Sequence, residues 1–190
     1  MVCLALGIRC LIGVVFLASA VSKVTGRGAF DRFVSSVEDM RVVPTRSGRS
    51  VARWVVVAEF TVCLSLATPV RAAGVAGFVI AGGLLAAFAA GIVLSLRQGV
   101  RTPCRCFGVS ARPLGPGHAV RNLVLVAVAI AGAVTTAGAS GVAAPGASAV
   151  AVLGGLLVGG LVTALDDVLD LFRPVDRAPG LARGPVNPSR

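Results

Sequence analysis

Long apolar runs separated by polar connections dominate the chain. Because about 20 residues of helix cross the hydrocarbon core of a bilayer, each run of this kind predicts a transmembrane helix. There are five such runs, over residues 4–21, 51–68, 72–96, 118–137 and 149–165. The pattern predicts an all-α fold, a polytopic membrane helix bundle of five transmembrane helices, with a four-helix core plus one further helix.

A shorter periodic stretch lies between the first two runs. Phe30, Phe33, Val34 and Val37 recur at the spacing of one helix face, and charged residues occupy the other faces. This spacing predicts an interfacial amphipathic helix after the first transmembrane helix, lying in the plane of the membrane surface.

The first run has a second interpretation. It contains one charge, Arg9, and a small-residue sequence, Ala18-Ser19-Ala20, that is similar to a signal-peptidase site. A cleaved signal peptide is therefore the alternative to a membrane helix. A signal peptide carries its positive charge before the apolar region. Since Arg9 lies inside the run, we favour a helix that is retained.

The composition supports integration into a membrane. Of the 190 residues, 56 % are hydrophobic and 14 % are charged, whereas about a quarter of the residues in a soluble domain are charged. The net charge of +10 is not arranged as a basic stripe interleaved with aromatic residues, so we expect no nucleic-acid partner. The lipid bilayer is the partner that the composition predicts.

The basic residues fall almost entirely on one side of a five-span topology. The connections after the first and third runs share a side with the C-terminal segment, and together they hold all but two, Arg9 and Arg71, of the 18 Lys and Arg residues. Since basic loops stay in the cytoplasm, we expect a multi-pass plasma-membrane protein with its N-terminus outside. Residues 1–172 would form the transmembrane domain, and residues 173–190, rich in Pro, Gly and Arg, a disordered cytoplasmic tail.

Two polar residues inside the apolar runs are candidate site residues. Glu59 lies near the middle of the second run, with Cys63 one turn later on the same face. Because an ionised group is costly at this depth, Glu59 should face the bundle and find a partner or a proton. A functional group and a structural carboxyl that is protonated or paired with Arg both fit. Asn122, in the first turn of the fourth run, can bond neighbouring backbone or loop groups.

The connection over residues 98–117 carries two cysteines one residue apart, Cys104 and Cys106. Arg101 and Arg105 lie beside them, and nearby cations favour the reactive thiolate form. A disulfide closing so small a ring is strained and labile, as in pairs that exchange. We therefore favour a thiol–disulfide redox pair. Two alternatives stay open: incidental loop cysteines, and a metal site, for which the pair and His118 are one ligand short of a tetrahedral set.

The stretch from Pro103 to Gly108 resembles the C-x-C-F-G signature of the methylamine utilisation protein MauE family, which is related to the DoxX-like membrane proteins. Three further pairs are similar to that family in the same order: Ser22-Lys23, Ala58-Glu59 and Arg121-Asn122. The resemblance covers roughly residues 4–170. The chain departs from it at Arg105, where many relatives carry another residue, often His.

The resemblance implies a redox-associated membrane protein linked to methylamine metabolism. It also implies a role in the maturation of methylamine dehydrogenase, whose small subunit is disulfide-rich. Disulfides form outside the cytoplasm, whereas the distribution of basic residues predicts that Cys104 and Cys106 lie inside. We keep the orientation that the charges predict.

Our first hypothesis is a thiol–disulfide oxidoreductase in which Cys104 and Cys106 exchange and Glu59 is a buried proton or hydrogen-bond partner. The supporting residues are Arg101, Arg105 and Asn122. A thiol or disulfide protein is the expected partner, and a membrane quinone is a candidate cofactor. The alternative is a non-catalytic scaffold or accessory protein, with residues 30–37 and the basic loops as its docking face. A small transporter fits less well because no inverted repeat is recognisable.

Overall fold

The computed structural model describes residues 1–42, 44–99, 116–141 and 144–171, with side chains as far as residue 164 except that of Thr45. Within these residues the regular structure is all helical, without strands, and five helices are long and apolar enough to cross a membrane. The predicted helical membrane bundle is confirmed. The helices are α1 (Val2–Val24), α2 (Ala29–Asp39), α3 (Gly48–Ala67), α4 (Arg71–Arg97), α5 (Pro116–Ala137) and α6 (Pro145–Leu171), with a short 3-10 helix, η1 (Thr45–Ser47), before α3.

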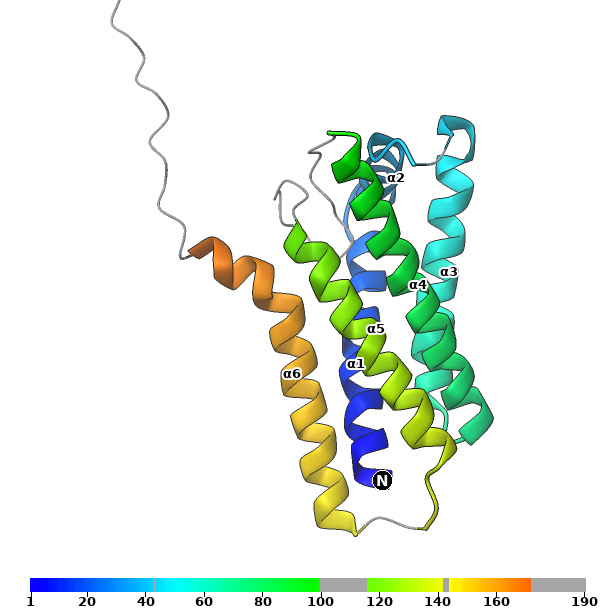
Figure 1. Cartoon of the computed structure of the whole chain (residues 1–190), viewed down its shortest axis with the longest axis vertical. Helices are drawn as coiled ribbons and strands as arrows, with labels where there is room; N and C mark the ends of the chain where they lie inside the picture. The colour runs from blue at the N-terminus through cyan, green and yellow to red at the C-terminus, as the bar shows by residue number, and fades with distance from the viewer. Residues whose placement is uncertain (43, 100–115, 142–143, 172–190) are drawn as a thin grey trace, which may run out of the picture.

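The five long helices alternate in direction through the bundle (Figure 1). One end, which we call the α2 end, holds α2, the C-terminal ends of α1 and α4, and the beginnings of α3 and α5. The opposite end, the Arg9 end, holds the N-terminus, the turn over residues 68–70 and the connection between α5 and α6. The connections after the first and third transmembrane helices therefore share one end, as a five-span topology predicts.

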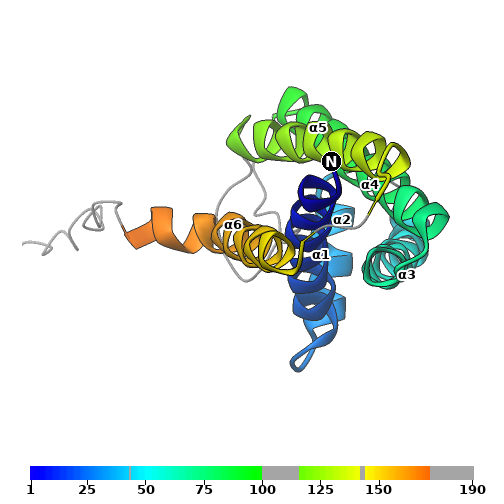
Figure 2. The same cartoon turned by 90° about the horizontal axis from the view of Figure 1, so that it is seen from below.

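Four helices, α1, α3, α4 and α5, enclose the apolar core. Helix α6 packs on the outer side of α1 (Figure 2), and of its described side chains only the partly buried Val162 joins this core. Large apolar side chains that point outward, such as Leu64 and Val79, suit a surface that lipid covers. The buried core residues are Ile12, Val15, Phe16, Val62, Leu66, Phe78, Ala81, Leu85, Leu125 and Ala129.

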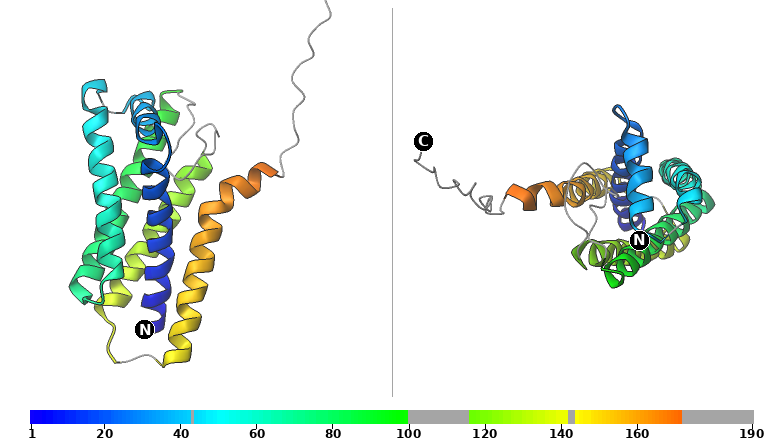
Figure 3. Two further views of the ribbon diagram at one scale, coloured as in Figure 1. Left: turned by 180° about the vertical axis from the view of Figure 1, so that it is seen from behind. Right: turned by 90° about the horizontal axis from the view of Figure 1, so that it is seen from above.

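Helix α2 lies across one end of the bundle (Figure 3). Gly26 and Gly28 turn the chain after α1 with φ angles of 99° and 69°, a left-handed conformation that glycine adopts without strain. The apolar face of α2 packs on α3, where Phe33 and Val34 are buried against Ala52. The predicted amphipathic helix is present, and its apolar face contacts protein.

The contact between α6 and α1 depends on small residues. Gly155 and Gly159 are one turn apart on α6, and both are buried. A Cβ atom at Gly155 would collide with the carbonyl oxygen of Gly7, and one at Gly159 would lie 2.9 Å from the carbonyl oxygen of Leu11. Since lipid offers no hydrophobic drive between helices, close backbone approach of this kind holds them together.

We predict that Gly155→Ala destabilises the protein by about 1–3 kcal/mol, the usual cost of overpacking, because α6 must move away from α1. Gly154→Ala is the matched control, since Gly154 is exposed and its added methyl group would meet no described atom within 4 Å. Thermal unfolding in detergent micelles measures both variants. Equal unfolding temperatures would contradict this packing of α6.

Candidate functional site

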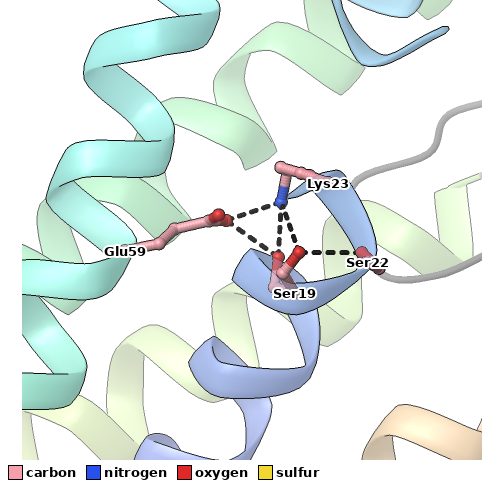
Figure 4. A network of polar contacts seen from close by, with 4 residues as sticks. All are labelled: Ser19, Ser22, Lys23 and Glu59. Carbon is pink, nitrogen blue, oxygen red and sulfur yellow. Dashed lines mark hydrogen bonds and ion pairs between the residues drawn. The ribbon is translucent and has the colours of Figure 1, made fainter. Parts of the chain in front are cut away.

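A buried ion pair joins α1 to α3 near the α2 end of the bundle (Figure 4). The ammonium of Lys23 donates a hydrogen bond to Oε1 of Glu59 at 2.7 Å, and the hydroxyl of Ser19 donates to the same oxygen at 2.8 Å. Nζ of Lys23 also lies 2.6 Å from Oγ of Ser19. The relative exposure of these residues is 1 % for Lys23 and Ser19 and 0 % for Glu59. We call these three residues the ion-pair cluster.

The last turns of α1 present both of its cluster residues to α3. Ser19 and Lys23 are four residues apart, so they lie on one face of the helix. The ammonium of Lys23 reaches back to the carbonyl oxygen of Ser19 at 3.3 Å, and the hydroxyl of Ser22 donates to that oxygen at 2.7 Å. These local bonds hold the end of α1 in the geometry that the ion pair needs.

Helix α2 covers the cluster with an aromatic ring. The ammonium of Lys23 lies 4.8 Å from the ring centroid of Phe33, within the distance of a favourable cation–π contact. Phe33 itself is buried, and it packs on α3 next to Ala52. Three helices, α1, α2 and α3, therefore converge on the charge of Lys23.

The two charges of the pair compensate each other in a site without solvent contact. Taking a charged group out of water costs several kcal/mol per ion unless a close partner and further hydrogen bonds offset the loss. Oε1 of Glu59 accepts two such bonds, whereas its Oε2 is buried and accepts none from the described residues. One carboxylate oxygen is thus engaged, and the other can still accept a hydrogen bond.

The position of Glu59 agrees with the expectation that it faces the bundle and finds a partner. The partner is Lys23, and the interpretation in which an Arg pairs with Glu59 is wrong. The prediction that Lys23 belongs to the connection after the first transmembrane helix is wrong, because Lys23 lies inside α1. The Ser19-x-x-x-Lys23 spacing is the feature that could have identified it. Cys63 is half-buried and faces α1, with Sγ 4.0 Å from the carbonyl oxygen of Gly13.

Asn122 contributes a second buried polar group, from α5. It is 2 % exposed, and its Oδ1 accepts no hydrogen bond from the part of the chain that the structure describes. No hydrogen bond within the described residues joins it to the ion-pair cluster. The structure shows that Asn122 is buried and that its Oδ1 lacks a hydrogen-bond donor among the described residues. Its supporting role stays a prediction.

The predicted exchanging pair, Cys104 and Cys106, lies outside the described residues, and so do its neighbours Arg101 and Arg105. The flanking helix ends are described: α4 ends at Arg97 and α5 begins at Pro116, both at the α2 end. The cysteines within the described residues are free. No group of three His, Cys, Asp or Glu side chains suited to a metal occurs among those residues either. The described cysteines are Cys3, Cys10 and Cys63.

The family model described as Methylamine utilisation protein MauE matches residues 1–135. The chain belongs to the MauE family. The match spans α1 to the last turn of α5 and includes the whole ion-pair cluster, whereas the resemblance in sequence had been expected to reach about residue 170. Helix α6 lies beyond the matched residues. No curated protein and no solved structure matches this chain.

We predict that Lys23→Met and Glu59→Gln each destabilise the protein by about 3 kcal/mol, because either change leaves the other charge buried alone. The double variant should lose much less than the sum of the two. Unfolding in mixed micelles measures this double-mutant cycle.

The control cycle is Asp31→Asn with Arg49→Gln, because that ion pair joins α2 to α3 on the surface, with both side chains more than half exposed. Its coupling energy should not exceed about 1 kcal/mol. If the loss in free energy of unfolding in the Lys23→Met/Glu59→Gln double variant equals the sum of the two single losses, Lys23 and Glu59 do not compensate each other and the assignment is wrong.

Proposed function

We propose that this MauE-family membrane protein carries out or supports thiol–disulfide exchange through Cys104 and Cys106. The observation that carries the proposal is the position of two helix ends. In sequence the two cysteines and their flanking arginines lie between α4 and α5, and the end of α4 and the beginning of α5 lie at the same end of the bundle as the buried ion-pair cluster. A thiol pair flanked by cations, in a protein with a membrane-embedded polar site, favours redox chemistry over helix packing alone.

The proposed reaction exchanges one disulfide for another. The thiolate of one cysteine of the pair attacks a disulfide of a partner protein, breaks that bond and forms a mixed disulfide. The second cysteine attacks the mixed disulfide and releases the partner's other sulfur. The pair is oxidised to a disulfide and the partner disulfide is reduced to two thiols, which take up the two protons that the pair loses. The reverse direction would oxidise a partner dithiol.

Within this proposal the arginines and the ion-pair cluster have different roles. Arg101 and Arg105 stabilise the attacking thiolate as nearby cations. Glu59 is the buried proton or hydrogen-bond partner, and its Oε2 supports this role because it can accept a further hydrogen bond. Lys23 is a positioning residue that fixes the carboxylate of Glu59. Asn122 is a supporting residue: it adds a buried polar side chain from α5 at the same end of the bundle.

The family links the protein to methylamine utilisation. Because we also propose that the cysteine pair faces the cytoplasm, we propose a cytoplasmic thiol protein as the partner of the exchange, and maturation of a disulfide-rich dehydrogenase stays an expectation from the family resemblance. The alternative is a non-catalytic scaffold that docks a partner on α2 and the basic connections. One observation limits that alternative: Phe33 and Val34 are buried against α3 and cannot form an apolar docking face. A scaffold would have to use the exposed polar side of α2.

We further propose that the α2 end faces the cytoplasm at the plasma membrane, with the N-terminus outside. Support comes from the described basic residues outside the ion-pair cluster. Those at the Arg9 end are Arg9 and Arg71; the rest, Arg27, Arg32, Arg41, Arg46, Arg49, Arg53, Arg97 and Arg121, lie at the α2 end. Such a bias sets orientation through the positive-inside rule. Labelling of the cysteine pair from each side of the membrane distinguishes the two orientations.

We predict that Cys104→Ser or Cys106→Ser traps a mixed disulfide with a partner protein, because one cysteine remains to attack and its resolving thiol is gone. Non-reducing electrophoresis of acid-quenched membranes detects the adduct. Cys3→Ser is the matched control, since Cys3 lies in the first turn of α1 at the opposite end, and it should trap nothing.

Wild-type function in both single variants and in the double variant would reject thiol exchange. A partner that stays bound to the Cys104→Ser/Cys106→Ser variant, together with unchanged function, would favour the scaffold.

A further inference from the structure

The Arg9 end of the bundle carries positive charge without a matching carboxylate. Arg9 projects from α1, and Arg71 begins α4. The Asp and Glu side chains within the described residues lie in α2 and α3, and none pairs with either arginine. The described contacts of both guanidinium groups are neutral: Arg9 donates to the carbonyl oxygen of Thr68 at 3.1 Å, and Arg71 donates to that of Ala139.

Two adjoining cavities meet at Arg9, and Arg71 lines the smaller one. A groove of about 760 Å³ runs between α1, α3 and α6, with an apolar lining that includes Val14, Leu64 and Leu156. A smaller pocket of about 120 Å³ includes Arg9, Arg71 and Thr136 in its lining. The two cavities share Leu6, Arg9 and Pro69. A charged pocket is therefore continuous with an apolar groove that follows the transmembrane helices.

Two polar groups at this junction lack partners among the described residues. Nε of Arg9 is buried without an acceptor, and so is the hydroxyl of Thr136, a residue that is 5 % exposed. Buried polar atoms are nearly always hydrogen-bonded in folded proteins. Each of these atoms has less than 1 Å² of accessible area, so neither contacts the contents of the pocket. The two guanidinium groups that line the pocket have no carboxylate partner, and such a pair of cations favours an anion.

We propose that the Arg9 end binds one membrane phospholipid, with its phosphate in the pocket lined by Arg9, Arg71 and Thr136. One acyl chain lies in the groove between α1, α3 and α6. The phosphate pairs with the guanidinium groups of Arg9 and Arg71, which supply two positive charges. This site is independent of the thiol exchange proposed for the opposite end of the bundle.

The depth of the pocket in the bilayer suits a lipid headgroup. The guanidinium of Arg9 bonds to carbonyl oxygens of Thr68 and Val70, in the turn that joins two transmembrane helices. Such a turn lies where the headgroups of the bilayer begin. A soluble anion would use the charged pocket but leave the apolar groove empty. A phospholipid uses both cavities, and the groove lies among helices that lipid surrounds.

The test is native mass spectrometry of the full, delipidated chain in detergent, titrated with 1-palmitoyl-2-oleoyl-phosphatidylglycerol. The wild type should retain one lipid. Arg71→Gln should weaken binding about tenfold, since a charge-assisted contact contributes roughly 1.5 kcal/mol or more. Thr136→Val keeps the side-chain shape and removes a hydroxyl that has no accessible area, so this variant should bind lipid as the wild type does.

A third variant tests the groove itself. Gly13 lines it, and a Cβ atom at Gly13 would meet no described atom within 4 Å. Gly13→Leu should therefore fill the groove and weaken binding about tenfold, the effect of losing roughly 1.4 kcal/mol of buried chain. The matched controls are Gly83→Leu, on an exposed and open position of α4, and Arg97→Gln, which removes an exposed charge at the other end of α4. Both should bind lipid as the wild type does.

Wild-type lipid retention in Arg71→Gln would overturn the proposal, whatever Gly13→Leu does. The lipid assignment would also be overturned if inorganic phosphate displaced the bound lipid at equal concentration, or if Gly13→Leu bound the lipid normally. Either result would leave only a site for a free anion. A second copy of the chain in place of lipid, detected by its mass, would contradict the proposal too.

Discussion

The need to neutralise two charges inside a membrane bundle constrains this structure more than any other single interaction. Lys23 and Glu59 lie on different helices, and each is acceptable in the core because the other is 2.7 Å away. The pair joins the last turn of α1 to α3. Ser19 and Phe33 add a hydrogen bond and an aromatic contact. Through Phe33 the same charge also contacts α2.

The two ends of the bundle consequently differ in chemistry. The α2 end combines the buried ion pair, the covering helix, the end of α4 and the beginning of α5, and it carries all of the described basic residues except Arg9 and Arg71. At the Arg9 end the described charged side chains are two arginines. Both bond to backbone carbonyl oxygens and line a pocket. The exchange proposed for one end and the lipid binding proposed for the other are separate and need no contact with each other. The apolar core of α1, α3, α4 and α5 lies between the two ends and holds these helices together.

The sequence predicts much of this fold, because lipid imposes a simple rule on helix length. The apolar runs located the five long helices, and the spacing of Phe30, Phe33, Val34 and Val37 located α2. An intramembrane carboxyl marked Glu59 as buried and partnered. The identity of its partner depended on how far α1 continues, which hydropathy does not determine, so Lys23 was counted with the connection. The pocket at Arg9 depends on three helices meeting, which a single sequence does not reveal. The roles of Cys104 and Cys106 stay predictions.

The central claim is that Cys104 and Cys106 form an exchanging thiol pair at a cytoplasmic α2 end. Alkylation with a membrane-impermeant maleimide, applied to inside-out vesicles and to intact cells before and after mild reduction, tests it most directly. The Cys104→Ser/Cys106→Ser variant gives the background from the other three of the five cysteines. The account predicts that both thiols are labelled from the cytoplasmic side and that labelling increases after reduction. Labelling from the outside alone, or labelling that reduction does not change, would contradict it.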